Sequence, residues 1–238
     1  MKVFDTEIKA ALYCEKTLIN IVENNPSTLI CLAAGHTSLA LFKRLIQSEK
    51  AGKVDFSNVK IVGLDEWVGL SGDDDGSCEN FLRKNLFDHI GVIKSNIRLF
   101  DGKAHDLKQE CENIEAFISK NGGIDYMLLG VGMNGHLGLN EPGISEDSTA
   151  GVVMLDAVTK AVADKYFIEK PELTGGVTLG IKNILQVKKV QVLITGERKK
   201  DIVKKIVLSK KTNTIPATLI KDQENVEFIL DKHAASLL

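Results

Sequence analysis

Short apolar runs alternate with amphipathic helical patterns along most of the chain, and this alternation limits the folds that the chain can adopt. The apolar runs lie at residues 28–33, 59–64, 126–129, 190–195 and 226–230, with a shorter one near 152–155. Parallel neighbouring strands need crossover connections of about a dozen residues, which the intervening helical segments supply. The pattern therefore predicts an α/β fold: a Rossmann-like, doubly wound, mainly parallel sheet with helices on both faces, closed by the run at 226–230.

The helices between these runs follow from apolar residues spaced three or four apart. They are expected after Gly35, over 81–90, over 107–118, near 158–167 and from Glu197 onward. No Pro-rich or Ser-rich linker and no repeat of fixed period interrupts the 238 residues. A chain of this length can bury a sizeable core. We therefore expect one domain over residues 1–238.

Composition excludes several classes of partner. A net charge of −2 with 26% charged residues gives no electrostatic ground for binding nucleic acid or an acidic membrane. The lysines of residues 198–211 accompany apolar residues at helical spacing, which indicates a solvated helix face. A small molecule is the expected partner. Both a monomer and a homo-oligomer remain open, because no feature of the composition identifies a subunit interface.

The cysteines and the N-terminus bear on cellular location. The four cysteines are far apart and form no CxxC pair, so neither a zinc site nor a disulfide framework is predicted. Residues 1–12 lack the apolar core of a signal peptide, and no run approaches the ~18 apolar residues of a membrane span. A cytoplasmic protein is expected. The phosphate-binding motif GxxxxGK[ST] is also absent, and neither a nucleotide cofactor nor a metal is predicted.

Four loops carry the polar residues that follow predicted strands. They are residues 34–38, 65–67, 134–141 and 196–199. Ligands of open α/β sheets bind in the crevice outside the carboxyl ends of the strands. We therefore expect these four segments to meet at one edge of the sheet.

The segment 34–38, AGHTS, resembles a phosphate cradle. Gly35, His36 and Thr37 precede a predicted helix, so backbone N–H groups, a hydroxyl and the helix N-terminus would all favour an anion. Alternatively, Thr37 or Ser38 only caps the helix. Lys199 could add a point charge to the same phosphate, or it could be an ordinary exposed lysine.

Two adjacent carboxylates end the second predicted strand. Side chains alternate along an extended chain, so only one of Asp65 and Glu66 is expected to face a given cleft, and we select Asp65. Shielded beside Trp67, it could act as a general base on carbon, or it could be a cap near the surface. No GxSxG segment or metal-ligand spacing accompanies it, which favours a proton-transfer enzyme.

The glycine-rich stretch 130–143, GVGMNGHLGLNEPG, follows the strand at 126–129. It places His136 and Glu141 where they would face the cleft. The alternative is that its glycines only make tight turns, with His136 as a turn residue.

These two polar segments also carry a family resemblance, which runs nearly end to end. Residues 64–70, LDEWVGL, are similar to the LDEYVGL motif of the glucosamine-6-phosphate deaminase (isomerase) family, and residues 132–142 resemble its GxxGHIAFNEP motif. That family is related to the 6-phosphogluconolactonases. The resemblance implies a glucosamine-6-phosphate isomerase-like domain. It also implies a reaction without cofactor or metal, in which a hexosamine 6-phosphate becomes a ketohexose 6-phosphate and ammonia by formal hydrolysis of a C–N bond.

The resemblance also implies roles for individual residues. His136, assisted by Glu141, would open the sugar ring by moving protons at the ring oxygen and the anomeric hydroxyl. Asp65 would take the proton from C2 and return it at C1. Lys199 matches the family's phosphate-binding lysine.

Departures from the family pattern qualify these roles. Asn134 stands where well-known members have Asp, so it can orient His136 but carries no charge. Lys165 stands where the family has a phosphate-binding Arg, which exchanges a bidentate fork for a point charge. His36 adds an imidazole to the phosphate loop. The C4 epimer therefore stays open between glucosamine 6-phosphate and galactosamine 6-phosphate, and no activation by an N-acetyl-sugar phosphate is expected, because residues 145–151 contain no basic side chain.

Two alternatives remain beside the amino-sugar-phosphate enzyme. A 6-phosphogluconolactonase-type hydrolase would share the fold, the phosphate loop and a histidine, but residues 64–70 and the ending Asn140-Glu141-Pro142 favour the deaminase. A non-catalytic sugar-phosphate sensor would keep the pocket without proficient chemistry. Asn134, His36 and Lys165 motivate that reading.

Overall fold

The computed structural model describes residues 1–163, 167 and 173–238. In this part of the chain a seven-stranded sheet has the order β1-β10-β9-β6-β2-β3-β5, and every neighbouring pair is parallel. The strands are β1 (Lys2–Phe4), β10 (Val226–Asp231), β9 (Lys189–Ile194), β6 (Tyr126–Leu129), β2 (Leu29–Leu32), β3 (Lys60–Val62) and β5 (Ile97–Arg98). The predicted Rossmann-like, doubly wound α/β fold is confirmed.

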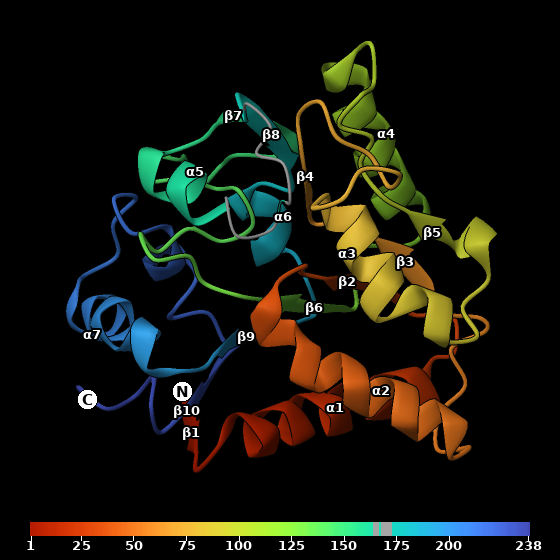
Figure 1. Ribbon diagram of the computed structural model, residues 1–238, viewed down its shortest axis with the longest axis horizontal. Helices are drawn as coiled ribbons and strands as arrows, with labels where there is room; N and C mark the ends of the chain where they lie inside the picture. Colours follow the sequence, from red (N-terminus) through yellow and green to blue (C-terminus); the bar gives the residue numbers. More distant parts are fainter. Residues whose placement is uncertain (164–166, 168–172) are drawn as a thin grey trace.

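Helices cover both faces of this sheet. They are α1 (Glu7–Asn24), α2 (Leu39–Lys50), α3 (Cys78–Asn85), α4 (Leu107–Lys120), α5 (Ala157–Ala163), α6 (Ile181–Leu185) and α7 (Lys200–Leu208), with the 3-10 turns η1 (His36–Ser38), η2 (Phe87–His89), η3 (Lys94–Asn96), η5 (Glu197–Lys199) and η6 (Pro216–Leu219). Figure 1 shows α1 and α2 on one side of the central strands, and α4, α5 and α6 on the other. No helix in the described residues is long and apolar enough to span a bilayer.

Alternation along the strands divides the core into two layers. Leu29 and Cys31 of β2 pack into the cluster that contains α4, α6 and α7. Ile30 and Leu32 pack into the cluster that contains α1 and α2. All four are at most 1% exposed. Strands buried on both faces read as continuous apolar runs, which is why this strand was visible in the sequence.

Three of the helices, α1, α3 and α4, begin at side-chain caps. Thr6 accepts a hydrogen bond from the N–H of Lys9 at the start of α1. Asp106 does the same for Gln109 at the start of α4. Such caps satisfy N–H groups that have no partner within the helix and contribute about 0.5–2 kcal/mol each.

The chain reverses its direction of travel across the sheet between β2 and β6. From β2 it proceeds to β3 and β5 on one side, and then returns to β6, β9 and β10 on the other. The loops that leave the carboxyl ends of β2 and β6 therefore diverge. This topological switch point is where open α/β sheets bind ligands.

A second, smaller sheet stands beside the carboxyl ends and was not predicted. It has the order β4-β8-β7, with β4 (Asp65–Trp67), β8 (Gly175–Thr178) and β7 (Gly151–Met154) paired antiparallel. Two expectations need correction. Residues 65–67 form a strand of this sheet and not a loop, and the run near 152–155 belongs here and not to the central sheet.

The edge of the central sheet also differs from the prediction. β10 does not close the sheet, because the three-residue β1 pairs with it in parallel. A strand of three residues gives no measurable period, so the sequence pattern could not reveal it. The helix expected over 81–90 is two elements, α3 and η2, because Leu86 leaves helical geometry at φ −145°. The helix expected near 158–167 is α5, described as far as Ala163.

Candidate active site

A cavity of about 190 Å³ lies at the switch point between β2 and β6. Its lining draws on three of the predicted loops, namely residues 34–38 after β2, the turn after β6 with His136, and Lys199 after β9. The fourth contribution, Asp65, comes from the small sheet. α3 and α5 complete the wall. The structure thus brings together chemistry from segments more than 130 residues apart in sequence, as the parallel sheet required.

Asp65 lies at the first position of β4, where it pairs with Thr178 of β8 and lines the cavity. Burial raises the pKa of Asp65 to about 6, against the lowering effects of a hydrogen bond from the Cys78 thiol and the charge of His136. A carboxylate with such a pKa is ionised at neutral pH and is a stronger base than an ordinary aspartate.

Gly138 is the backbone against which the Asp65 carboxylate packs. Its φ is +57°, and a Cβ there would lie 2.8 Å from Thr178 Oγ1 and 3.3 Å from Asp65 Oδ2. Both the left-handed conformation and the close approach require glycine. Gly138, one of the glycines of the stretch 130–143 that were considered as turn residues, therefore also makes room for the carboxylate.

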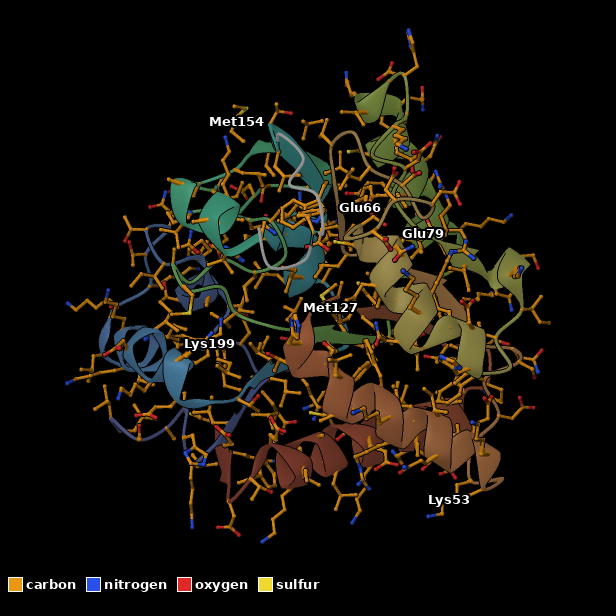
Figure 2. All side chains as sticks on the ribbon, viewed as in Figure 1. Lys53, Glu66, Glu79, Met127, Met154 and Lys199 are labelled. Carbon is orange, nitrogen blue, oxygen red and sulfur yellow. The ribbon has the colours of Figure 1, made fainter. Side chains whose placement is uncertain are left out.

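Glu66 faces away from the cavity and into the N-terminus of α3. Its carboxylate accepts hydrogen bonds from the N–H groups of Trp67, Cys78 and Glu79, each at 2.9 Å. Burial raises the pKa of Glu66 to about 7, against those three donors. In Figure 2, Glu66 and Glu79 are labelled close to one another, where β4 meets the start of α3. Glu66 therefore holds α3 in place beside the site.

Cys78 is a cavity residue whose contact with Asp65 was not predicted from the sequence. It is the first residue of α3, lines the cavity and hydrogen-bonds to Asp65. Burial, together with the two neighbouring carboxylates, raises the pKa of the thiol well above its ordinary value. The group therefore stays a neutral donor to Asp65. No local pattern marks this role, because the contact depends on the distant start of α3 meeting β4.

The His136 imidazole has its Nδ1 side occupied by protein groups. Thr159 Oγ1 lies 3.0 Å from Nδ1, and Glu141 Oε2 lies 3.5 Å from the same nitrogen. Asn134 Nδ2 donates to Glu141 Oε2 at 2.8 Å, while its Oδ1 accepts from the His136 N–H at 3.2 Å. Asn134 and Glu141 are not among the residues that line the cavity, so they support His136 from behind.

Glu141 is a buried carboxylate, 8% exposed. Burial opposes its ionisation, but hydrogen bonds and charge from His136, with further bonds from Thr159 and Asn134, hold the pKa of Glu141 below its usual range. It is therefore negative at neutral pH and stabilises a positive charge on His136. Next to it, Asn140 donates to the carbonyls of Leu137 and Leu179, each at 2.8 Å, which fixes the loop to the small sheet.

Gly132 makes the close approach on which the imidazole rests. A Cβ at this position would lie 2.3 Å from Cε1 and Nε2 of His136, which no side chain could accommodate. The turn is closed by the N–H of Gly132 donating to His136 O and that of Gly135 donating to Gly132 O, each at 3.0 Å. These glycines therefore make tight turns, and the same stretch brings His136 to the cavity, whereas Glu141, which was also expected to face it, lies behind the imidazole.

The segment after β2 has the form of an anion site. Gly35 has φ +129° and leads into η1, in which the Ser38 hydroxyl donates to Ala33 O at 2.9 Å. Because Ser38 is used inside the turn, Thr37 is the better placed of the two hydroxyls. His36 packs against Phe81 of α3 with ring centroids 6.2 Å apart.

Lys199 reaches the cavity from the other side. It follows β9, and its ammonium donates to Val131 O in the loop after β6. Asp231, at the end of β10, accepts from the N–H of Gly196 at 3.0 Å and so anchors the turn that carries Lys199. Figure 2 labels Lys199 at the start of the segment that continues into α7. Lys165, the other predicted phosphate cation, lies outside the described residues.

Thr159 is the residue that sequence reasoning missed altogether. It is 4% exposed, and it belongs to α5 together with the cavity-lining residues Val158, Val162 and Ala163. The only available signal was a hydroxyl on the apolar face of that helix. Among the described residues, no group of three or more His, Cys, Asp or Glu side chains could hold a metal ion.

Comparison with known families gives an independent finding. The sequence matches the family model described as glucosamine-6-phosphate isomerases/6-phosphogluconolactonase over residues 5–229. Two relatives named glucosamine-6-phosphate deaminase are each 38% identical. The one from a Thermoanaerobacter species aligns over 91% of this chain and 86% of its own length. The one from Clostridium perfringens aligns over 94% and 93%.

Solved structures agree with these relatives. A monomeric glucosamine-6-phosphate deaminase of the NagB superfamily is similar with a TM-score of 0.95 and 32% identity, over 100% of both chains. The 6-phosphogluconolactonase of Thermotoga maritima is similar with a TM-score of 0.77 over 97% of this chain and 98% of its own. At 18% identity, the second likeness concerns the fold alone.

Proposed function

The chain belongs to the family of glucosamine-6-phosphate isomerases and 6-phosphogluconolactonases, and on that premise we propose that it isomerises and deaminates a hexosamine 6-phosphate. The products are a ketohexose 6-phosphate and ammonia. The observation that carries the proposal is that Asp65, with its raised pKa, and His136, backed by Glu141, line one cavity. The first suits proton abstraction from carbon, and the second suits proton transfer between oxygens.

His136 opens the sugar ring in the first step. The imidazole takes the proton of the anomeric hydroxyl and delivers a proton to the ring oxygen, so that the C1–O5 bond breaks and a C1 aldehyde forms. The imidazolium that exists in between is stabilised by the carboxylate of Glu141, whose Oε2 lies 3.5 Å from Nδ1. Asn134 contributes by holding Glu141, and it adds no charge of its own.

Asp65 performs the isomerisation. Its carboxylate removes the C2 proton while a proton of the C2 ammonium passes to the aldehyde oxygen, which gives an enolamine. The carboxyl group then returns its proton at C1, which leaves a protonated imine at C2. Water adds to that imine and ammonia leaves, which completes the ketose. The base must be ionised and close to carbon, and the raised pKa of Asp65 strengthens it without protonating it at pH 7.

The phosphate binds between two loops that follow different strands of the central sheet, β2 and β9. Gly35, His36 and Thr37 supply backbone N–H groups and a hydroxyl from the segment after β2. Lys199 supplies a cation from the segment after β9. Lys165 is proposed as a second cation on the strength of the sequence alone.

Ammonia release from glucosamine 6-phosphate and galactosamine 6-phosphate tests this function and selects the epimer. Purified wild-type protein is expected to turn over at least one of the two. Asp65→Asn is expected to lower kcat by at least about 10²-fold, the scale of positioned acid–base catalysis. Asp75→Asn is the matched control, because Asp75 is an exposed residue whose carboxylate pairs with Lys84 at the surface.

Two outcomes would contradict the proposal. Hydrolysis of 6-phosphogluconolactone without ammonia release would assign the chain to the lactonase branch of the family. Tight binding of a hexosamine 6-phosphate with no turnover of either epimer would indicate a sensor.

We propose a cytoplasmic enzyme, which agrees with four free cysteines and a metabolic substrate. It works as a monomer or a homo-oligomer, and sedimentation of the purified chain distinguishes these states. The relative that is described as monomeric matches this chain over its full length.

A further inference from the structure

The Thr159 hydroxyl lies between the two groups of the ring-opening machinery. Its Oγ1 is 3.0 Å from His136 Nδ1, and the hydroxyl also helps to lower the pKa of Glu141. The direct distance from Nδ1 to Glu141 Oε2 is 3.5 Å, longer than the 2.7–3.2 Å typical of an N–H···O hydrogen bond. The Thr159 hydroxyl is therefore the nearer of the two groups that face Nδ1.

The chemistry of the three groups fixes the direction of these hydrogen bonds. An ionised carboxylate only accepts, and the lowered pKa of Glu141 keeps it ionised at neutral pH. The single Thr159 proton therefore points to Glu141, and the oxygen's lone pair accepts from Nδ1–H of His136. This network assigns the proton of the neutral imidazole to Nδ1 and leaves Nε2 as the proton acceptor.

We propose that Thr159 is a positioning residue that relays the charge of Glu141 to His136 and holds the imidazole in the Nδ1–H tautomer. This role belongs to the proposed function, and the kinetic test of it rests on that function. In that tautomer Nε2 can take the anomeric proton and pass it to the ring oxygen, while Nδ1–H stays on Thr159. The opposite tautomer would present an N–H to the substrate and could not start this step.

The relay also links ring opening to the wall of the cavity. Thr159 belongs to α5, and its neighbours Val158, Val162 and Ala163 line the same cavity. A substrate that packs against α5 therefore contacts the helix that holds Thr159 against the imidazole. Asn134 is uncharged and donates a hydrogen bond to Glu141, so Glu141 carries the negative charge beside His136 without help from Asn134. The contact through Thr159 is therefore more important.

The test removes the hydroxyl while keeping the shape of the side chain. Thr159→Val is expected to lower kcat by about 10- to 100-fold with KM changed less than about threefold, because proton transfer and not substrate binding is impaired. Thr159→Ser keeps the hydroxyl and is expected to stay within about threefold of the wild type. Thr149→Val, at an exposed threonine outside the cavity, is the matched control. Thr159→Ala serves if the valine variant does not fold.

A second readout does not depend on the substrate. The ¹⁵N shifts of the His136 ring in histidine-labelled protein, assigned with His136→Gln, report which nitrogen carries the proton. We expect the Nδ1–H tautomer in the wild type and in Thr159→Ser, and a shift of population towards Nε2–H in Thr159→Val. Wild-type kcat in the folded valine or alanine variant, or an unchanged tautomer, would overturn the inference. If the wild type turns over neither sugar, the proposed function fails and the tautomer measurement alone decides the role of Thr159.

Discussion

Asp65 and Glu66 are consecutive residues whose carboxylates serve opposite sides of one strand. Asp65 lines the cavity, whereas Glu66 is 1% exposed and binds three backbone N–H groups at the start of α3. Because Cys78 opens that helix and contacts Asp65, the structural carboxylate places a donor against the carboxylate proposed as the base. Burial raises the pKa of both groups, and it outweighs the three backbone donors at Glu66 as well as the Cys78 thiol and the charge of His136 at Asp65.

Replacing Asp65 by Asn should stabilise the fold at neutral pH. The folded-state pKa of about 6 exceeds the ordinary value of 3.8, so the folded state prefers the protonated form. The resulting penalty is absent below the unfolded-state pKa, grows as pH rises towards 6, and is complete above it. For a partly exposed side chain we expect Asp65→Asn to raise the free energy of unfolding by roughly 1–3 kcal/mol at pH 7.5. Urea unfolding at pH 7.5 and 5.0 measures it.

The change in the stability gain of Asp65→Asn between pH 7.5 and pH 5.0 tests the cause of that gain. The gain should shrink at pH 5.0, where Asp65 in the wild type is largely protonated. Asp75→Asn at the exposed control position should change stability by less than about 0.5 kcal/mol at either pH. A gain that is equal at both pH values would show that the burial of charge at Asp65 is not its cause.

Glu66→Gln also removes a buried charge, because burial raises the pKa of Glu66 to about 7, but we expect its net effect to be a loss of stability, since it breaks a backbone hydrogen bond as well. The glutamine amide places an NH₂ where a carboxylate oxygen now accepts a backbone N–H, so at least one buried donor loses its partner. That loss costs about 1–3 kcal/mol. Chemical denaturation at pH 7.5 measures it. Glu79→Gln is the matched control in the same helix, because Glu79 pairs with Arg83 near the surface. If Glu66→Gln is no less stable than this control, the capping role of Glu66 is refuted.

The parallel sheet was predictable because its strands are buried on both faces. Residues 126–129 were predicted as a strand with the bounds that the structure gives, since an uninterrupted apolar run ends at a glycine. The meeting of the three polar segments that follow β2, β6 and β9 was expected from parallel topology, whereas Asp65 reaches the cavity from the small sheet. The small sheet was not predictable by these means, because β8 is Gly-Gly-Val-Thr and β4 holds two carboxylates, and neither has the composition of a strand.

The candidate site was predictable to the extent that local patterns reveal it. Alternation along an extended segment correctly separated Asp65 from Glu66 as the one that faces the cavity. Thr159 and Cys78 depend on α5 and α3 meeting distant loops, and no spacing rule encodes such tertiary contacts. The proposed catalytic roles, the phosphate role of Lys165 and the single-domain extent over 1–238 stay predictions.

Ionisation of Asp65 should set the acid limb of the pH–rate profile, and the Cys78 thiol should shift that limb. Catalysis needs ionised Asp65, so kcat/KM should fall as pH drops through about 6. Burial raises this pKa, while the Cys78 hydrogen bond and the charge of His136 lower it. Removing the thiol in Cys78→Ala should therefore raise the pKa of Asp65 and move the acid limb to higher pH. Initial rates of ammonia release between pH 5 and pH 8 measure the shift.

A serine at the same position separates the donor from the volume of the side chain. Cys78→Ser keeps a hydrogen-bond donor, so its acid limb should stay near that of the wild type. The substrate phosphate also titrates near pH 6, but this titration is common to all variants and cancels in the comparison. An acid limb that is identical in the alanine variant and the wild type would remove Cys78 from any role in tuning Asp65.

Lys199→Met should weaken binding of the phosphate more than it slows the chemistry. The substitution keeps an apolar stem and removes the ammonium that reaches the cavity between the loops after β6 and β9. A charge-assisted hydrogen bond is worth about 1.5–3 kcal/mol, so KM should rise about 10- to 100-fold with kcat reduced less. Lys200→Met is the matched control, since Lys200 pairs with Glu197 outside the cavity.

The unphosphorylated amino sugar shows whether Lys199 acts on the phosphate or only supports the loop. If the ammonium binds phosphate, the variant should lose preference for the 6-phosphate and keep whatever weak activity the wild type has towards the free sugar. If its bond to Val131 O merely ties the two loops together, activity should fall equally for both compounds, because the whole cavity would loosen. A Lys199 variant with the KM of the wild type would place the phosphate elsewhere in the cavity.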